Sequence, residues 1–356
     1  MDTVLVIGAG DMGERLVDGL AASGAVRRVL VAGRGEAARA VAAAVGSARD
    51  CRVESVRLDA SRPEEVAALL TAERPVLLVN SAAVRGPWAT AGRTDPAAEA
   101  VAAAGLALRL PYQLPLVLSV MRGVRLAEYA GPVVNLSFPD VTGPVLARLG
   151  LAPTVGLGNA GMVRLRVRAA LRAGRPEGEL PLVRVLAHHA QVYGVMRSEA
   201  PADPALRCRV HLGEQGERAD DLAYLAPPLA PGPRYNLVTA AAALPVLTAL
   251  LPGGAPLRTS TASPGGLPGG LPVRIADGTV LPDLPPGLTL DEAVAWNERM
   301  AAGDGVDRID PDGTVHLTEA VHRAVAGIDP GLAAPIGVAD LTERAARLDA
   351  ALGLTA

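Results

Sequence analysis

Cysteine is scarce in this sequence, because its 356 residues include only Cys51 and Cys208. Two thiols cannot form a disulfide framework or a four-thiolate zinc site. No basic and then apolar leader precedes the first apolar segment, and no apolar run reaches the roughly 18 residues of a membrane-spanning helix. We therefore expect a cytoplasmic protein that has no metal site and does not contact a membrane.

An excess of either charge is also missing, since 34 basic and 37 acidic residues give a net charge of −3. This balance argues against binding to nucleic acid or to a membrane surface through bulk electrostatics. Aromatic residues make up only 2% of the chain, yet half of all residues are apolar, so a substantial core can still be buried. The expected partner is a small-molecule substrate, and we also expect a homo-oligomer.

Four segments in the first 80 residues are predicted to be strands, at 3–7, 28–32, 53–58 and 76–79, and the first of them is a continuous apolar run. Segments with apolar residues at helical spacing separate these runs. Strands that alternate with helices of about 10 to 15 residues imply right-handed crossovers and a parallel sheet covered on both faces. The sequence therefore predicts an α/β fold with a doubly wound parallel sheet, the Rossmann class.

The pattern changes near residue 150, so we predict a dinucleotide-binding domain at 1–150 and a second, α+β domain for substrate and dimerisation at 151–356. Runs at 182–187 and 207–212 predict strands of this second domain. Segment 252–286 is rich in glycine and proline, and we expect an irregular loop there that orders over the site. Helices are expected in the C-terminal tail, at 290–301, 317–326 and 341–352.

The first apolar run leads directly into Gly8-Ala9-Gly10-Asp11-Met12-Gly13, which fits the G-x-G-x-x-G pattern and opens a helix. The first glycine would make the turn, the second would let a pyrophosphate approach, and the third would allow close helix packing. Unpaired N–H groups and the helix dipole favour an anion at this point. A glycine turn that binds nothing is the alternative, but the strand–turn–helix context favours a cofactor site.

The end of the second strand lacks the acidic residue that usually binds the ribose 2′-hydroxyl of NAD about 20 residues after the motif. Gly33 and Arg34 stand there instead. Gly33 leaves room, and Arg34 offers a planar charged fork for a 2′-phosphate, with Arg39 as support. This predicts NADP as the cofactor, with NAD less favoured. The alternative interpretation of Arg34 is a solvated arginine at a helix start.

Asn80, Ser81 and Ala82 follow the fourth strand. Ligands of open α/β sheets bind in the crevice at the carboxyl ends of the strands. Small side chains there would let the nicotinamide ribose come close, so we predict that these three residues bind the cofactor. Ordinary turn residues would look the same.

Two family resemblances follow from longer segments. Residues 4–79 resemble the nucleotide-binding half of saccharopine-dehydrogenase-like reductases, through VLVIGAGDMGERL, VLVAGR, VESVRLDASRPEEVAALL and VLLVN. Residues 133–194 resemble the lactate and malate dehydrogenases, through VVNLSFPDVTGPVLARLGLAPTVGLGNAGM and then VRVLAHHAQVYG. In that family a strand ends in Asn-Pro, a G-x-G segment follows, and a later strand ends in a catalytic His-Gly. The resemblances imply a nicotinamide-dependent oxidoreductase.

The second resemblance implies roles for individual residues. It places the proton-transferring histidine at His189, and the arginine that clamps a substrate carboxylate at Arg164 or Arg166. The aspartate that orients the histidine would fall at Gly161 or Met162, so it is absent from its usual position.

Two further positions depart from the family pattern. Phe138 occupies the place of the asparagine in the Asn-Pro turn, although Asn135 stands three residues earlier. Ala190 replaces the glycine that follows the catalytic histidine. The resemblance therefore implies a reductase with rearranged catalytic residues.

His188 and His189 are neighbours in a segment that we expect to be a strand, so their side chains would point to opposite faces. One of them would face the crevice and donate a proton, and Tyr193 is a second candidate donor farther along the strand. Two ordinary hydrogen-bonded histidines are the alternative. Arg85 and Arg93 lie in the loop after the fourth strand, where a closing loop often brings an arginine to the substrate.

These features predict an NADP-dependent oxidoreductase that transfers a hydride to or from a carbonyl or imine of a small polar metabolite that carries a carboxylate. A noncatalytic NADP-binding sensor is one alternative, and an epimerase-type enzyme with a tightly held cofactor is another. A polar crevice lined by histidine and arginine would favour the oxidoreductase over the sensor.

Overall fold

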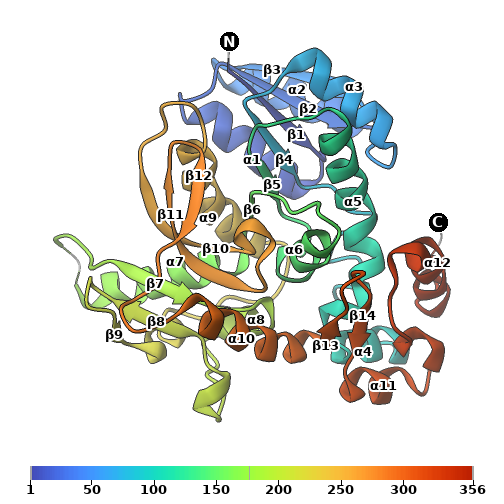
Figure 1. Ribbon diagram of the computed structural model, residues 1–356, viewed down its shortest axis with the longest axis vertical. Coiled ribbons are helices and arrows are strands. Elements are labelled where there is room, and N and C mark those ends of the chain that lie inside the picture. Colours follow the sequence, from blue (N-terminus) through green and yellow to red (C-terminus); the bar gives the residue numbers. More distant parts are fainter. Residues whose placement is uncertain (1, 176, 355–356) are drawn as a thin grey trace.

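The computed structural model describes residues 2–175 and 177–354. Its main feature, within these residues, is a nine-stranded sheet in the order β12-β11-β10-β6-β5-β4-β1-β2-β3 (Figure 1). The strands of this sheet are β1 (Thr3–Ile7), β2 (Arg28–Gly33), β3 (Arg52–Arg57), β4 (Leu77–Asn80), β5 (Val133–Asn135), β6 (Val155–Gly156), β10 (Leu257–Ala262), β11 (Gly270–Ala276) and β12 (Thr279–Pro282).

Strands β3, β2, β1, β4, β5 and β6 are parallel and adjacent in that order. This is the 3-2-1-4-5-6 order of dinucleotide-binding folds, in which the chain reverses its direction of growth between β1 and β4. The predicted doubly wound Rossmann class is therefore confirmed. Because the strands are parallel and in register, Ile7, Asn80 and Asn135 end at the same edge of the sheet.

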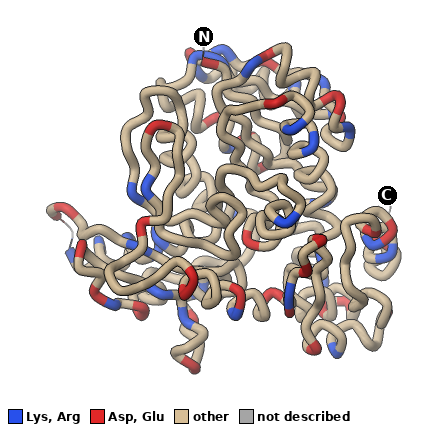
Figure 2. Tube along the Cα trace, in the orientation of Figure 1, with Lys and Arg blue, Asp and Glu red and all other residues tan. Residues whose placement is uncertain are grey.

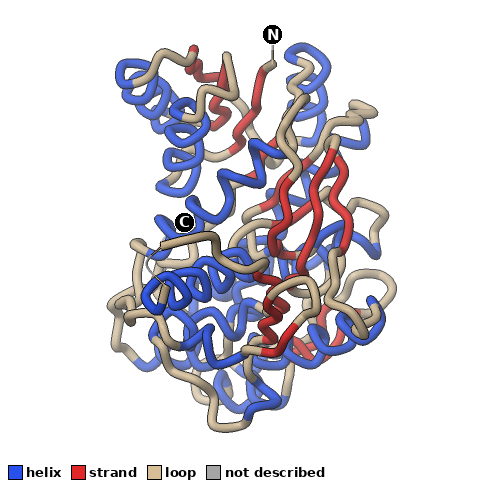
Figure 3. Tube along the Cα trace, turned by 90° about the vertical axis from the view of Figure 1, so that its left-hand side faces the viewer, coloured by secondary structure: helices blue, strands red, loops and turns tan. Residues whose placement is uncertain are grey.

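Helices cover the sheet on both sides, and Figure 3 shows them around the strands in a second view. Helix α1 presents Leu16, Val17 and Leu20 to the core, at the helical spacing read in the sequence. The described α-helices are α1 (Asp11–Ala22), α2 (Glu36–Ala48), α3 (Pro63–Glu73), α4 (Pro96–Ala103), α5 (Leu110–Leu126), α6 (Pro139–Arg148), α7 (Asn159–Gly174), α8 (His189–Arg197), α9 (Tyr235–Ala249), α10 (Leu290–Met300), α11 (Glu319–Val325) and α12 (Leu341–Ala351). The expected tail helices match α10, α11 and α12.

The glycine- and proline-rich segment 252–286 forms strands β10, β11 and β12, so the prediction of an irregular loop is wrong. These strands pair antiparallel with one another, and β10 joins the parallel sheet through β6. Leu271, Val273 and Ile275 alternate along β11 and are fully buried, which holds the strand in place. Gly266 and Gly269 have positive φ in the turn between β10 and β11, so these glycines make a tight connection.

Two smaller sheets complete the fold, β7 (Val183–Leu186) with β8 (Arg209–Leu212) and β9 (Glu217–Arg218), and β13 (Val306–Ile309) with β14 (Val315–Leu317). Strands β7 and β8 match the predicted runs. The main sheet continues past residue 150 through β6 and β10, and the C-terminal helix α12 packs against α5. The division into two domains at residue 150 stays a prediction.

Charged residues of both signs are scattered along the chain in the view of Figure 2. Among the described residues, no single helix is long and apolar enough to cross a membrane, although the pair Pro96–Ala103 and Leu106–Leu126, bent by 111°, passes the same test of length and composition. In the same residues no group of three or more His, Cys, Asp or Glu side chains is arranged to hold a metal ion.

Candidate functional site

A cleft of about 570 Å³ runs along the carboxyl edge of the parallel strands. The glycine motif, Arg34 and Asp59 line one end, and the residues that follow β4 and β5 line the middle. The other end is lined by side chains from α7, α8 and α9, including Met162, His189 and Tyr235. The cleft is thus the crevice that the strand order predicts.

The three motif glycines have different surroundings. Gly8 has φ +109°, and a Cβ there would lie 2.7 Å from the backbone nitrogen of Ala82. A Cβ on Gly13 would lie 2.0 Å from the carbonyl oxygen of Gly8. Gly10 has no atom within 4 Å of its Cβ position, and it precedes α1 without a side-chain cap. Gly8 and Gly13 therefore serve the fold, while Gly10 leaves space beside uncapped N–H groups, which fits a pyrophosphate.

Ala9, Asp11 and Met12 are the other motif residues that line the cleft. Arg15 donates two hydrogen bonds to the Asp11 carboxylate, at 3.0 and 2.7 Å, and Asn236 donates a third at 2.7 Å. The hydrogen bond from Arg15 lowers the pKa of Asp11. This pairing offsets a negative charge that would otherwise oppose an anion at the helix start.

Gly33 and Arg34 line the end of the cleft beside β2. Arg34 is exposed, and among the described residues it has no hydrogen-bond or ion-pair partner. The carboxylate of its neighbour Asp59 accepts two hydrogen bonds from Ser61, one from the backbone N–H and one from the hydroxyl. These hydrogen bonds lower the pKa of Asp59. Arg39, the expected support, lies within 3.4 Å of Glu36 instead.

The three residues at the end of β4 have two different roles. Ser81 and Ala82 line the cleft, and the Ser81 hydroxyl donates to the carbonyl oxygens of Ile7 and Gly8 at 3.2 Å. Asn80 does not line the cleft. Its side chain is fully buried and donates to Asn135 on the adjacent strand at 3.1 Å. Asn80 therefore joins β4 to β5 beneath the site.

His188 and His189 do not belong to a strand, so the expectation that they point to opposite faces of one is wrong. Strand β7 ends at Leu186, and α8 begins at His189 with His188 as its N-cap. The Gln191 side chain accepts a hydrogen bond from the His188 backbone N–H at 2.9 Å, which starts the helix. Since Tyr193 follows His189 by four residues, both side chains lie on one face of α8, and both line the cleft.

Asp304 orients His189. It lies at the end of a short 3₁₀ turn, Ala301–Asp304, and the His189 Nδ1–H donates to its carboxylate at 2.8 Å. The other carboxylate oxygen lies 3.0 Å from Nδ1 of His188, a side chain with no exposed surface. The carboxylate partner that is missing from its usual sequence position is therefore supplied 115 residues later in the chain.

The pairing of His189 with Asp304, the His189–Asp304 dyad, shifts the pKa of both side chains. Burial is the largest single effect on the pKa of His189 and lowers it, but the charge of Asp304, its hydrogen bond and the charge of Asp140 together outweigh burial, so the net shift is upward. Burial acts to raise the pKa of Asp304, yet the two histidines hold it well below its ordinary range. His189 can therefore carry a proton at neutral pH while Asp304 stays ionised.

Asp140, at the start of α6, fixes the backbone of the dyad. Its carboxylate accepts from the His189 backbone N–H at 2.7 Å and from the Asn159 amide at 2.6 Å. The carboxyl group is buried, which raises its pKa. The carboxyl group thus ties α6, α7 and α8 together behind the cleft.

Aromatic side chains gather at the His189 end of the cleft. The Phe138 ring lies edge-on to His189 with ring centroids 5.2 Å apart. Trp88 and Tyr193 are 6.5 Å apart, and Tyr235 lies 5.9 Å from each of them. Burial raises the pKa of Tyr193, so its hydroxyl stays protonated.

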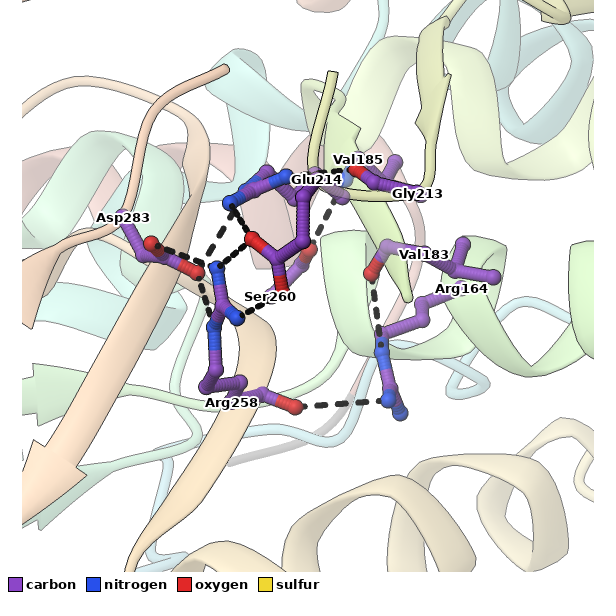
Figure 4. A network of polar contacts seen from close by, with 9 residues as sticks. Arg164, Val183, Val185, Gly213, Glu214, Arg258, Ser260 and Asp283 are labelled. Carbon is purple, nitrogen blue, oxygen red and sulfur yellow. Dashed lines mark hydrogen bonds and ion pairs between the residues drawn. The ribbon is translucent and has the colours of Figure 1, made fainter. Parts of the chain in front are cut away.

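Arg164 lies outside the cleft, in the network shown in Figure 4. Its guanidinium donates to the carbonyl oxygens of Val183 and Arg258, and burial lowers its pKa to about 10. In the same network Arg258 bonds to both Asp283 and Glu214. Arg164 therefore ties α7 to β7 and β10 instead of facing a substrate.

Arg166 also lies outside the cleft, and its guanidinium donates to the carbonyl oxygens of Ala226 and Pro227. The loop arginines are held in a similar way. Arg85 bonds to Asp349 at 2.7 and 2.9 Å, and Arg93 bonds to Asp95 at 2.7 Å. None of these arginines is among the residues that line the cleft in the described part of the chain.

Comparisons with known proteins agree with this geometry. Residues 4–85 match the family model of the saccharopine dehydrogenase NADP binding domain. No curated protein sequence matches the chain significantly.

Several solved structures resemble the whole fold. A malate dehydrogenase from Salinibacter ruber is 15% identical with a TM-score of 0.50, over 84% of this chain and 94% of that one. A lactate dehydrogenase from a Medee basin deep-sea metagenome library is 12% identical with a TM-score of 0.51, over 85% and 96%. Malate dehydrogenase from Plasmodium falciparum in complex with NADH is 10% identical with a TM-score of 0.50, over 92% and 100%. Residues 4–85 thus form a nicotinamide-dinucleotide-binding domain of the dehydrogenase type, and the chain has a dehydrogenase fold.

Proposed function

We propose that this protein is an NADP-dependent oxidoreductase that interconverts a carbonyl compound and its alcohol, with His189 as the proton donor and acceptor. The observation that carries the proposal is the position of His189, which is held by Asp304 and lines the same cleft as the Gly10 loop. A dinucleotide that lies along the strand ends would pass from Arg34 to the residues after β5. Its nicotinamide would then come close to the histidine.

The choice of NADP rests on Arg34 and on the residues around it. The end of β2 carries Gly33 and Arg34 and no acidic side chain. The guanidinium of Arg34, which has no hydrogen-bond or ion-pair partner among the described residues, lines the cleft beside the space that Gly33 leaves. A 2′-phosphate accepts charge-assisted hydrogen bonds from such a group, whereas a 2′-hydroxyl gains less from it. The match of residues 4–85 to an NADP-binding family model supports the same choice.

The histidine has the features of a general acid and base. When bound, the nicotinamide supplies or accepts a hydride at its C4 carbon, so the protein must move one proton. Asp304 fixes the imidazole with Nδ1 protonated, which leaves Nε2 for the substrate oxygen. The raised pKa of His189 favours proton donation at neutral pH. Tyr193, one helical turn away, is a second candidate donor, and Ser81 and Ala82 are candidate contacts of the nicotinamide ribose.

A catalytic role accounts for the dyad better than a sensor does, because a sensor has no use for an oriented acid at the nicotinamide end. An epimerase-type enzyme would use the same groups but would return the hydride to its product. Net consumption of NADPH separates these two reactions.

The test combines binding with isotope transfer. The purified chain is titrated with NADPH and NADH, and is then incubated with a panel of aldehydes and ketones and with NADPH in which both hydrogens at C4 are deuterium. We expect tighter binding of NADPH and an alcohol product that contains the deuterium. Failure to bind either dinucleotide, or alcohol without deuterium, would contradict the proposal.

A further inference from the structure

The substrate end of the cleft holds an unusual share of the aromatic residues. The chain has one phenylalanine, two tryptophans and five tyrosines, and four of these eight line this cleft: Trp88, Phe138, Tyr193 and Tyr235. Trp88 packs edge to face against Tyr193 and Tyr235, and these two tyrosine rings are tilted at 53° to each other, so the three rings form a triangle with centroids 5.9 to 6.5 Å apart. At these separations the rings touch one another and form a continuous apolar wall.

Formal charges are absent from the same end of the cleft. Among the described lining residues, the charged ones are Asp11, Arg34 and Asp59, and all three belong to the dinucleotide end. Among the described lining residues at the aromatic end, His189 is the side chain that can carry a positive charge, and Asp304 already balances that charge. A carboxylate that entered here would lose its hydration without gaining an arginine partner, and it would approach the buried Asp140 and Asp304.

Arg109 is the arginine that could still pair with a substrate carboxylate at this end of the cleft. Burial lowers its pKa, whereas the charges of Tyr193 and Tyr112 raise it, and the positive charge of Arg109 in turn lowers the pKa of His189. Its guanidinium donates to the Pro87 carbonyl and to the Thr90 hydroxyl, so it holds the loop that carries Trp88. It does not line the cleft.

We propose that the site takes an uncharged carbonyl substrate with a flat aromatic or apolar group, which lies against Trp88, Tyr193 and Tyr235. This substrate class rests on the function proposed above. It replaces the carboxylate-bearing metabolite that we expected from the sequence. In the reduction, the carbonyl carbon forms a C–H bond with the electron pair from the reduced nicotinamide. The C=O π pair moves to oxygen, which takes a proton from Nε2 of His189, and the dinucleotide is oxidised.

Equilibrium binding tests the pocket without any reaction. Benzamide and benzoate have nearly the same shape but differ in charge, and acetamide lacks the ring. With the protein saturated with NADP⁺, calorimetric titration should give benzamide an affinity at least about tenfold above that of benzoate and of acetamide. Tyr235→Leu should lower the affinity for benzamide at least about fivefold. Tyr129→Leu, which changes a tyrosine outside the cleft, should leave it unchanged.

Turnover provides the second measurement. Phenylglyoxylate and its methyl ester carry the same ketone beside the same ring, and the ester should have the higher kcat/KM by at least about tenfold.

Equal or tighter binding of benzoate, absence of benzamide binding, or a preference for the free acid in turnover would overturn the proposal. If Arg109→Gln then removed the benzoate affinity, Arg109 would be the anion anchor. If the wild-type protein bound no NADPH or transferred no deuterium, the oxidoreductase function would instead be overturned. That result does not depend on the ratio of the benzamide and benzoate affinities.

Discussion

The two ends of the cleft are built in different ways. The dinucleotide end uses residues 8–13, 33–34 and 81–82, which follow β1, β2 and β4 within the first quarter of the chain. The substrate end combines Trp88, Phe138 and the His189–Asp304 pair, which are spread over more than 200 residues. A phosphate is held mainly by backbone N–H groups, so one local turn can specify its site. An oriented acid needs side chains from several elements.

This comparison predicts that changes at the substrate end will affect turnover and spare the dinucleotide. His189→Gln should lower kcat by roughly 10² to 10⁴, the usual contribution of a general acid. NADPH affinity should stay near that of the wild type, because His189 is at the opposite end of the cleft from Arg34. Steady-state kinetics and NADPH titration check both parts. His322→Gln, on the exposed surface of α11, is the matched control. A variant that kept wild-type turnover would remove His189 from the mechanism.

The glycine motif allows folding and binding to be separated within the dinucleotide end. Gly13→Ala places a Cβ 2.0 Å from the Gly8 oxygen, so we expect it to destabilise the fold by about 1–3 kcal/mol. Gly10→Ala meets no atom and has an ordinary backbone, with φ −80°, so its thermal stability should match the wild type. Its NADPH affinity should nevertheless fall at least about tenfold. Thermal unfolding and NADPH titration of both variants check this, and unchanged NADPH affinity in Gly10→Ala would contradict the assignment of the pyrophosphate site.

Arg34 sharpens the comparison further, because it should act on the choice of dinucleotide alone. A charge-assisted hydrogen bond contributes about 1.5–3 kcal/mol, so Arg34→Gln should weaken NADPH binding roughly 10- to 100-fold. NADH affinity should change little. Titration with both dinucleotides measures the ratio of the NADPH and NADH affinities, and Arg39→Gln is the neighbouring control. If the control removed the preference and Arg34→Gln did not, the 2′-phosphate would lie at Arg39.

Asp304 should have the subtlest effect, a shift in pH dependence. Reduction needs protonated His189, so its rate should fall as the pH rises through the pKa of that group. Asp304→Asn removes the charge that raises this pKa, and the fall should move to lower pH by about one unit or more. The pH profile of kcat/KM measures it. An unshifted profile would assign the alkaline limb to another group.

The same dyad predicts a pH-dependent stability. Because the pKa of His189 is raised on folding, its ion pair stabilises the protein fully below the unfolded pKa of about 6.5 and less as the pH rises through the folded value. The difference in melting temperature between the wild type and Asp304→Asn should therefore be larger near pH 6 than well above the folded pKa. A constant difference would indicate that Asp304 has only a packing role.

The two main errors of the sequence interpretation have different causes. HHAQVYG follows a buried strand and continues its apolar pattern, so it looked extended, but the cap formed by His188 and Gln191 turns the chain into α8. Segment 252–286 looked irregular from its composition, yet pairing with β6 and burial of Leu271 and Val273 make it part of the main sheet. For segment 252–286 composition is a poor guide, because contacts distant in sequence hold its strands. For HHAQVYG the apolar pattern does not reveal the cap.

The sequence by itself determined the parallel sheet, the glycine turn and Arg34 at the end of β2, because periodicity and backbone conformation are local properties. Only the tertiary structure brought Asp304 to His189, buried Arg164 among carbonyl oxygens, and gathered Trp88 and Tyr235 at one end of the cleft. No spacing rule connects these residues in the chain. Their positions follow from how α7, α8, α9 and the 3₁₀ turn before β13 pack against the sheet, and that packing depends on the whole core.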